Sequence, residues 1–99
     1  MNTLQIKNEK VEIRKTNGSL VRTIGSNVVS ADINSNQSLI AMVLSNGKVE
    51  IRKDDGSLVR TFDAKAETIK WYGMELLITT KTNRTELRSD IGTLIRNLK

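Results

Sequence analysis

The stretch KVEIRKDDGSLVRTF, from Lys48 to Phe62, has an almost identical copy, KVEIRKTNGSLVRTI, from Lys10 to Ile24. A weaker copy, RTELRSDIGTLIRNL, runs from Arg84 to Leu98. The first two copies begin 38 residues apart and the last two begin 36 residues apart. A nearly constant period of this length indicates a chain built from repeated structural units.

Within each copy the local pattern is that of β-strands. Val49 and Ile51 alternate with charged residues, which places both on one face of a strand. The run SLIAMVL at Ser38–Leu44 is apolar on both faces, as in a strand that is covered on both sides. Dipeptides such as Asn46-Gly47 accept the positive φ of a tight hairpin turn. The middle copy therefore predicts four antiparallel strands, at Val28–Ile33, Ser38–Leu44, Lys48–Lys53 and Ser57–Phe62.

The other two copies follow the same pattern with small losses. The third copy predicts strands at Glu67–Tyr72, Glu75–Thr80, Arg84–Ser89 and Thr93–Leu98. The first copy predicts only three strands, at Thr3–Lys7, Lys10–Lys15 and Ser19–Ile24. The third copy is two residues shorter, and deletions fall in turns because a loss inside a strand would reverse its faces. We expect one loss where SNGK becomes TNR at 82–84, which removes the glycine, and one where NSNQSL becomes YGMEL at 72–76.

These units resemble the blades of WD40-like β-propellers, whose repeats have about 40 residues and four antiparallel strands. The phrase KVEIRKDDGSLVRTF is similar to the third and fourth strands of such a blade, and VVSADINSNQSLIAMVLSNG at 28–47 is similar to the first two. The Trp-Asp and Gly-His pairs of WD40 repeats are absent. The resemblance implies an all-β chain with one repeat domain, 1–99, divided into blade 1 at about 1–25, blade 2 at about 26–63 and blade 3 at about 64–99.

Three blades cannot close a ring, since propellers close with about four to eight. Two copies of the chain would make six blades around a two-fold axis, so we expect a homodimer. A fragment of a longer propeller is the competing interpretation. The strand that blade 1 lacks is the innermost one. We expect a blade of three strands, although a C-terminal segment of the partner copy could also fill the place.

The composition excludes much chemistry. The 99 residues contain no Cys and no His, which removes disulfides, thiolate and histidine catalysis, and the commonest transition-metal ligands. We therefore expect a protein that is not an enzyme and that carries no cofactor and no metal. There is no long apolar run and no signal-peptide pattern, so a cytoplasmic location is expected, and Asn-rich turns suggest a bacterial or phage origin.

Repeated charges are the first candidates for functional residues. Glutamates and arginines recur two residues apart on the third strand, and we expect them to form structural pairs between neighbouring blades: Glu12, Arg14, Glu50, Arg52, Glu86 and Arg88. A ring of guanidinium groups for a polyanion is the alternative. The fourth-strand arginines lie on the solvent rim, where a solvated face and a ligand site are both open: Arg22, Arg60 and Arg96.

The third copy departs from the repeat at IKWYGM, Ile69–Met74. There Lys70 and Tyr72 are candidate ligand-binding residues, because an exposed aromatic beside a cation can stack on a sugar or a base. Trp71 aligns with Ile33 and is expected in the core. The net charge of +5 raises the prospect of an anionic partner. The function expected by elimination is a non-catalytic binding module for a protein partner. A glycan-binding propeller lectin and a basic module for nucleic acid or another polyanion are the alternatives, and no membrane partner is expected.

Overall fold

The computed structural model describes residues 2–36, 38–90 and 92–98. It contains eleven strands in three antiparallel sheets and no helix. The first sheet has three strands, β1 (Asn2–Lys7), β2 (Lys10–Lys15) and β3 (Leu20–Ile24). The second has four: β4 (Val28–Ile33), β5 (Leu39–Leu44), β6 (Lys48–Lys53) and β7 (Leu58–Asp63). The third also has four: β8 (Ala66–Tyr72), β9 (Glu75–Thr80), β10 (Thr85–Arg88) and β11 (Leu94–Asn97).

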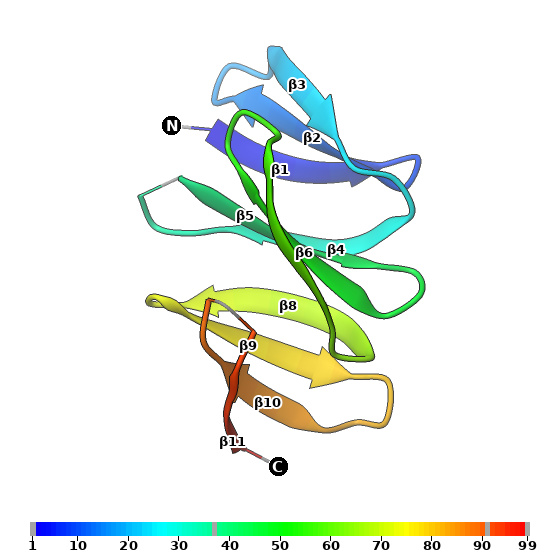
Figure 1. Ribbon diagram of the computed structural model, residues 1–99. Helices are drawn as coiled ribbons and strands as arrows, with labels where there is room; N and C mark the ends of the chain where they lie inside the picture. The colour runs from blue at the N-terminus through cyan, green and yellow to red at the C-terminus, as the bar shows by residue number, and fades with distance from the viewer. Residues whose placement is uncertain (1, 37, 91, 99) are drawn as a thin grey trace.

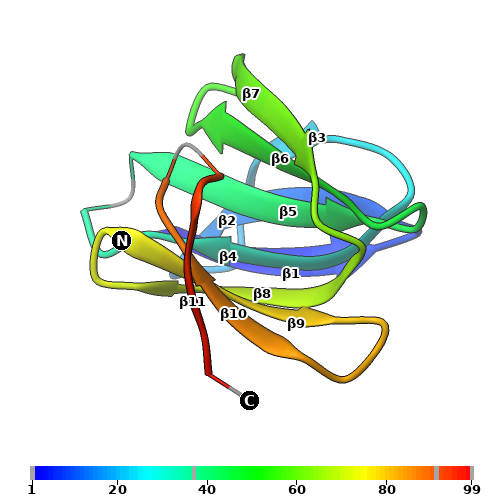
Figure 2. The same ribbon diagram turned by 60° about the horizontal axis from the view of Figure 1, so that its bottom comes forward.

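The three sheets stack face to face in chain order, with the ends of the chain at opposite ends of the stack (Figure 1). We call them blade 1, blade 2 and blade 3. The view in Figure 2 shows β1, β4 and β8, the first described strand of each blade, running side by side through the stack. The prediction of an all-β chain of three blades, with blade 1 one strand short, is confirmed.

Alternation in the sequence explains which residues meet between blades. Strands β2 and β6 have the same sequence, KVEIRK, and the same burial pattern, with only the valine and the isoleucine fully buried. The cluster between blades 1 and 2 joins Val11 and Ile13 to Val28, Ile40 and Met42. The cluster between blades 2 and 3 is larger: Ala41, Val43, Val49 and Ile51 meet Ala64, Ala66, Ile69, Leu76 and Ile78. Strand β5 contributes to both clusters, as its two apolar faces predicted.

One expectation about the turns was wrong. Val43 pairs with Val49 and Thr79 pairs with Thr85, so the β5–β6 and β9–β10 turns have the same length. Asn83 stands where blade 2 has Gly47, and both residues have positive φ. An asparagine side chain tolerates the left-handed region, so the glycine was replaced and not deleted. Both missing residues come from the turn between the first two strands of blade 3, where Tyr72 pairs with Glu75.

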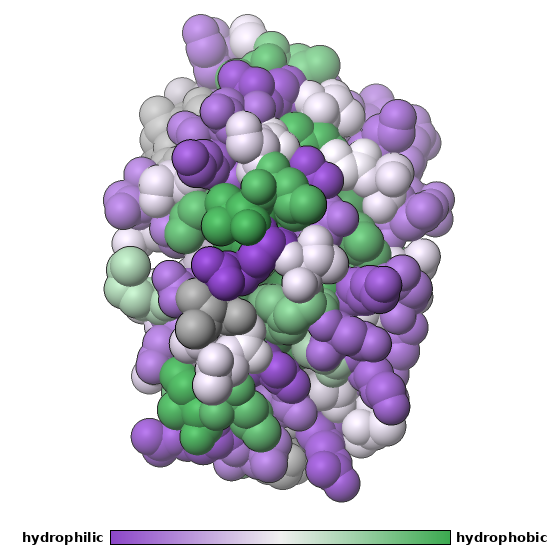
Figure 3. Space-filling model, viewed as in Figure 1, coloured by the Kyte–Doolittle hydropathy of each residue, from purple (hydrophilic) through white to green (hydrophobic). Residues whose placement is uncertain are grey.

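The outer strands carry an apolar stripe along the rim of the stack. Each of β3, β7 and β11 exposes two neighbouring apolar side chains, and the exposed fractions lie between 38% and 53%: Leu20, Val21, Leu58, Val59, Leu94 and Ile95. Figure 3 shows apolar surface over the middle blade and again over the last blade. We call these six residues the rim stripe.

Candidate functional site: the open face of blade 3

Contacts between neighbouring blades repeat at the outer strands. A methyl group on Gly56 would lie 3.0 Å from Cγ2 of Ile24, and one on Gly92 would lie 2.8 Å from the ring of Phe62. Ile24 and Phe62 hold equivalent places on β3 and β7, and the two glycines lie in the turns after β6 and β10. In each case an outer strand of one blade packs on a turn of the next blade.

Arg22 adds a polar link of the same kind. Its Nη1 donates a hydrogen bond of 2.8 Å to the backbone oxygen of Asp55, in the turn of the next blade. Hydrogen bonds from the side chain and the backbone N–H of Ser57 lower the pKa of the exposed Asp55 carboxyl below its ordinary 3.8. The carboxylate that holds this turn therefore stays ionised to lower pH than a free aspartate.

The turn glycines give a test of this packing. Gly92 and Gly18 have nearly the same φ, +94° and +91°, but nothing lies within 4 Å of a methyl group on Gly18. We expect Gly92→Ala to lower the free energy of unfolding by about 2 kcal/mol more than Gly18→Ala, because only the first substitution drives a methyl group into Phe62. Urea unfolding at low protein concentration, followed by Trp71 fluorescence, measures the difference. Equal losses would show that the close approach of Phe62 is not required.

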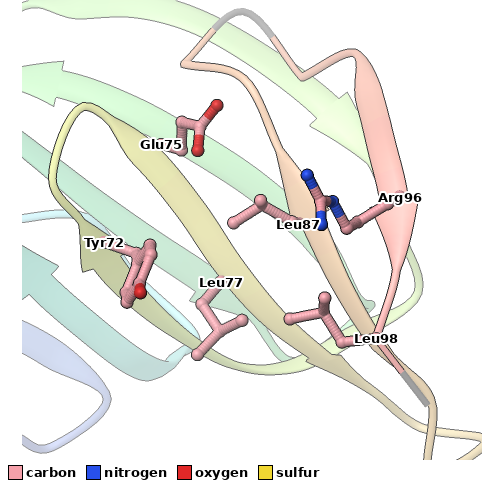
Figure 4. A pocket seen from close by; sticks show the side chains of 6 residues that line it. All are labelled: Tyr72, Glu75, Leu77, Leu87, Arg96 and Leu98. Atoms are coloured by element: carbon pink, nitrogen blue, oxygen red, sulfur yellow. The ribbon is translucent and has the colours of Figure 1, made fainter.

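Blade 3 presents the same kind of face without a neighbouring blade in the part of the chain that the structure describes. The face holds a hollow of about 450 Å³, lined by Tyr72, Glu75, Leu77, Leu87, Arg96 and Leu98 (Figure 4). The three leucines occupy the positions that blade 2 fills with Ala41, Ile51 and Phe62. We call this surface the open face. It is equivalent to the face that blade 2 turns toward blade 3.

The structure brings together two of the five candidate ligand-binding residues. Tyr72 and Arg96 both line the hollow of the open face. Lys70 is exposed on β8 and pairs in register with Leu77, so it lies beside the hollow on the same face of the sheet. Arg22 is engaged with the next blade. Arg60 lies on β7, in register with Ile51, away from the hollow. Ligand binding by these residues stays a prediction.

The glutamate and arginine pairs run within a strand, and the expected pairing between blades is not what these contacts show. Glu12 and Arg14 lie 3.0 Å apart, Glu50 and Arg52 lie 3.0 Å apart, and Glu86 and Arg88 lie 2.9 Å apart. Residues two apart share a face of a strand, so the long arginine side chain reaches its own neighbour first. Nη1 of each arginine also donates a 2.7 Å hydrogen bond to a turn carbonyl, of Gly18, Gly56 or Gly92.

Arg88 does contact a neighbouring blade, but through a cation–π contact and not through an ion pair. The Arg88 guanidinium carbon lies 5.7 Å from the centre of the Phe62 ring. This is within the range of a cation–π interaction. The link between blades 2 and 3 therefore uses the face of the guanidinium, while its N–H groups hold the glutamate and the turn.

The outer face of blade 1, at the other end of the stack, is more polar than the internal contacts between blades, as is the open face. Thr3 and Gln5 are exposed on the face of β1 that points away from blade 2. The equivalent positions of blade 2 hold Ile40 and Met42. On the open face of blade 3, Thr79 and Thr85 replace Val43 and Val49. At both ends of the stack, polar residues therefore stand at positions where an internal contact between blades has apolar residues that face each other.

Sequence reasoning missed the leucines of the open face. Each has the apolar character that the repeat demands, so each was indistinguishable from a core residue. One signal could have indicated them: Leu98 aligns with Phe62, and the given sequence contains no fourth copy of the repeat to pack on Leu98. In the structure the Leu98 side chain is 49% exposed.

In the described part of the chain, no group of three acidic, histidine or cysteine side chains could hold a metal ion. The same residues include no helix that could cross a membrane.

Stacked four-stranded antiparallel sheets, joined outer strand to inner strand, define the β-propeller class of fold. No known family and no curated protein matches the sequence. Among solved structures, BamB from Moraxella catarrhalis matches with 10% identity and a TM-score of 0.73, over 95% of this chain and 31% of BamB. The Pan2 WD40 domain from Neurospora crassa matches with 11% identity and a TM-score of 0.76, over 97% of this chain and 32% of that one.

The β-propeller domain of Cps50 (Swd1) from Myceliophteria thermophila gives 13% identity and a TM-score of 0.70, over 98% of this chain and 34% of that chain. The chain therefore has a β-propeller fold and spans about a third of the length of each of these proteins. At such low identity, the likeness concerns the fold alone.

Proposed function

We propose that this protein is a non-enzymatic interaction module, which closes a six-bladed propeller by pairing with a second copy and offers its rim to a protein partner. One observation supports the proposal: the outer-strand residues at the two ends of the stack are equivalent to those on the two sides of the internal blade contacts. Leu98 takes the place of Ile24 and Phe62, and Gly18 takes the place of Gly56 and Gly92.

In the proposed ring the two end faces would complement each other at equivalent positions. With blade 3 of one copy on blade 1 of the other, Leu98 would cover the open space over Gly18. Arg96 would reach the backbone oxygen of Asn17, as Arg22 reaches that of Asp55. Gln5 would face the threonines of the open face, so a polar residue would meet polar residues.

Closure needs only two copies. A head-to-tail contact either closes into a ring or continues as a filament. Two chains of three blades give six, which is within the range in which propellers close. Each chain then uses its open face once and its blade 1 face once.

A protein partner is favoured over a polyanion by the state of the arginines and by the rim stripe. Arg14, Arg52 and Arg88 each bind a glutamate and a turn carbonyl, and Arg22 binds a carbonyl of the next blade. Guanidinium groups held in this way are less available to phosphates. The rim stripe offers apolar side chains at the same place on every blade, which suits a protein surface.

The solution mass tests this proposal. We expect light scattering behind a sizing column to give twice the chain mass of 11.1 kDa, unchanged over a wide range of concentration and salt. A monomer at all concentrations, or a ladder of larger species, would overturn the closed dimer.

A further inference from the structure

The described residues place no strand beside the free edge of β1, and we call this place the vacant position. In blades 2 and 3 the innermost strand, β4 or β8, lies at the edge of its sheet and pairs with the next strand, β5 or β9. In the described residues of blade 1, β1 itself is the edge. Because β1 is equivalent to β5 and β9, the position that is vacant is that of β4 and β8.

The inner strand of a blade has a specific role toward the next blade. Ser30 Oγ accepts a hydrogen bond of 3.2 Å from the backbone N–H of Ile69. Asp32 Oδ2 accepts one of 2.9 Å from the backbone N–H of Trp71, and the Asp32 carbonyl accepts one of 3.2 Å from the Trp71 indole. Side-chain acceptors on β4 thus bind outward-pointing N–H groups on β8.

Strand β4 presents the same arrangement toward the vacant position. Its register with β5 matches that of β8 with β9: Ala31 is equivalent to Ile69, and Ile33 to Trp71. The N–H groups of Ala31 and Ile33 therefore point to the vacant side. Ala31 is partly exposed, whereas Ile69 at the equivalent place is 2% exposed.

The free edge of β1 also offers backbone hydrogen-bonding groups to the vacant position. Leu4 and Ile6 on β1 are equivalent to Leu77 and Thr79 on β9, whose N–H and C=O groups point toward β8. The N–H and C=O groups of Leu4 and Ile6 therefore point away from β2, toward the vacant position. An extended segment can form a ladder on such an edge. The site therefore has two parts, the β1 edge for backbone pairing and the β4 N–H groups for side-chain acceptors.

We propose that blade 1 takes up an extended segment of another protein as its fourth, innermost strand. The segment would carry Ser or Thr and then Asp two residues later, facing β4, with apolar residues between and after them. A second copy of this chain is not the donor, because each of its described strands is already paired within a blade. This inference deepens the proposed function by naming the class of partner, and it does not require the dimer.

A labelled peptide tests the site. The probe has the sequence of residues 26–35, SNVVSADINS, which is the chain's own inner strand. We expect saturable binding to the full chain by fluorescence anisotropy. A peptide with alanine at the two acceptor positions, which correspond to Ser30 and Asp32, is expected to bind about tenfold more weakly or worse, because two hydrogen bonds are lost.

A protein variant gives the matching control. Ile6→Pro removes an N–H that points to the vacant position, so β1 and β2 still pair. We expect this variant to bind the peptide at least about fivefold more weakly. Equal binding of both peptides, equal binding to Ile6→Pro, or no binding at all would overturn the proposal.

Failure here is distinguishable from failure of the dimer. The peptide titration is repeated on Leu77→Arg, which alters only the open face of blade 3. If the wild-type chain is a monomer but the peptide binds with the expected discrimination, the strand site stands and ring closure fails. If the mass is that of a dimer and the peptide does not bind, ring closure stands and the strand site is refuted.

Discussion

Leu77→Arg is expected to convert the dimer to a monomer, with a dissociation constant raised at least about 100-fold. Leu77 lies in the centre of the open face, where the second copy would cover it. An arginine there would be desolvated without a partner, which costs about 3 kcal/mol or more. In the separate chain the same side chain is half-buried at the surface, so the substitution leaves the fold intact. Light scattering over a series of concentrations from about 1 to 100 μM measures the shift as a fall in mass toward the 11.1 kDa of one chain at the low end.

Leu58→Arg is the matched control for this prediction. It makes the same change of charge and size on β7, where Leu58 is 53% exposed and belongs to the rim stripe. We expect its mass to equal that of the wild type, because the rim takes no part in ring closure. If both variants dissociate alike, the effect is one of net charge and the open face is not the interface.

Much of the fold follows from the sequence because the decisive signals are local. The strand predicted at Ser57–Phe62 is found at Leu58–Asp63, and the one predicted at Arg84–Ser89 at Thr85–Arg88. Alternation fixes the buried face of each strand, and the turn residues fix where it ends. The third copy misled only at Asn83, where asparagine takes a backbone conformation usually held by glycine.

The candidate site follows less well from the sequence because it depends on what each blade meets. Tyr72 was recognisable as an aromatic residue that breaks the repeat. Leu87 was not, because a leucine is core in one blade and interface in the last one. The partner of Arg52 was equally undetermined, since its choice rests on the carbonyl of Gly56, which the turn geometry brings within 2.7 Å.

The two end faces of the stack differ in polarity, and the face of blade 1 is the more polar one. The face of blade 1 has lost its two large apolar residues on β1, whereas the open face keeps its leucines and changes only two valines to threonine. A polar outer face is the usual feature of a terminal repeat, because it keeps the end of a stack soluble. The open face is capped only in part, as the proposed dimer requires.

The last prediction tests this difference by exchanging equivalent residues. Ile78 in blade 3 and Gln5 in blade 1 hold the same position, and Ile78 is fully buried against blade 2. Ile78→Gln is expected to lower the free energy of unfolding by about 4 kcal/mol, because it removes buried apolar surface and places an amide in a dry contact. Gln5→Ile is expected to change that free energy by less than about 0.5 kcal/mol, since Gln5 is exposed in the single chain.

Urea denaturation of the two variants, made in the Leu77→Arg background so that dimer formation does not contribute, measures both values. A small loss for Ile78→Gln would mean that the contact between blades 2 and 3 is hydrated, and ring closure through an equivalent dry contact would be contradicted as well. In the dimeric background Gln5→Ile has a second expected effect. It removes the polar partner of Thr79 and Thr85, so the dissociation constant should rise although the single chain is unchanged. A chain whose ends were unrelated surfaces would show no such coupling between Gln5 and the threonines at its opposite end.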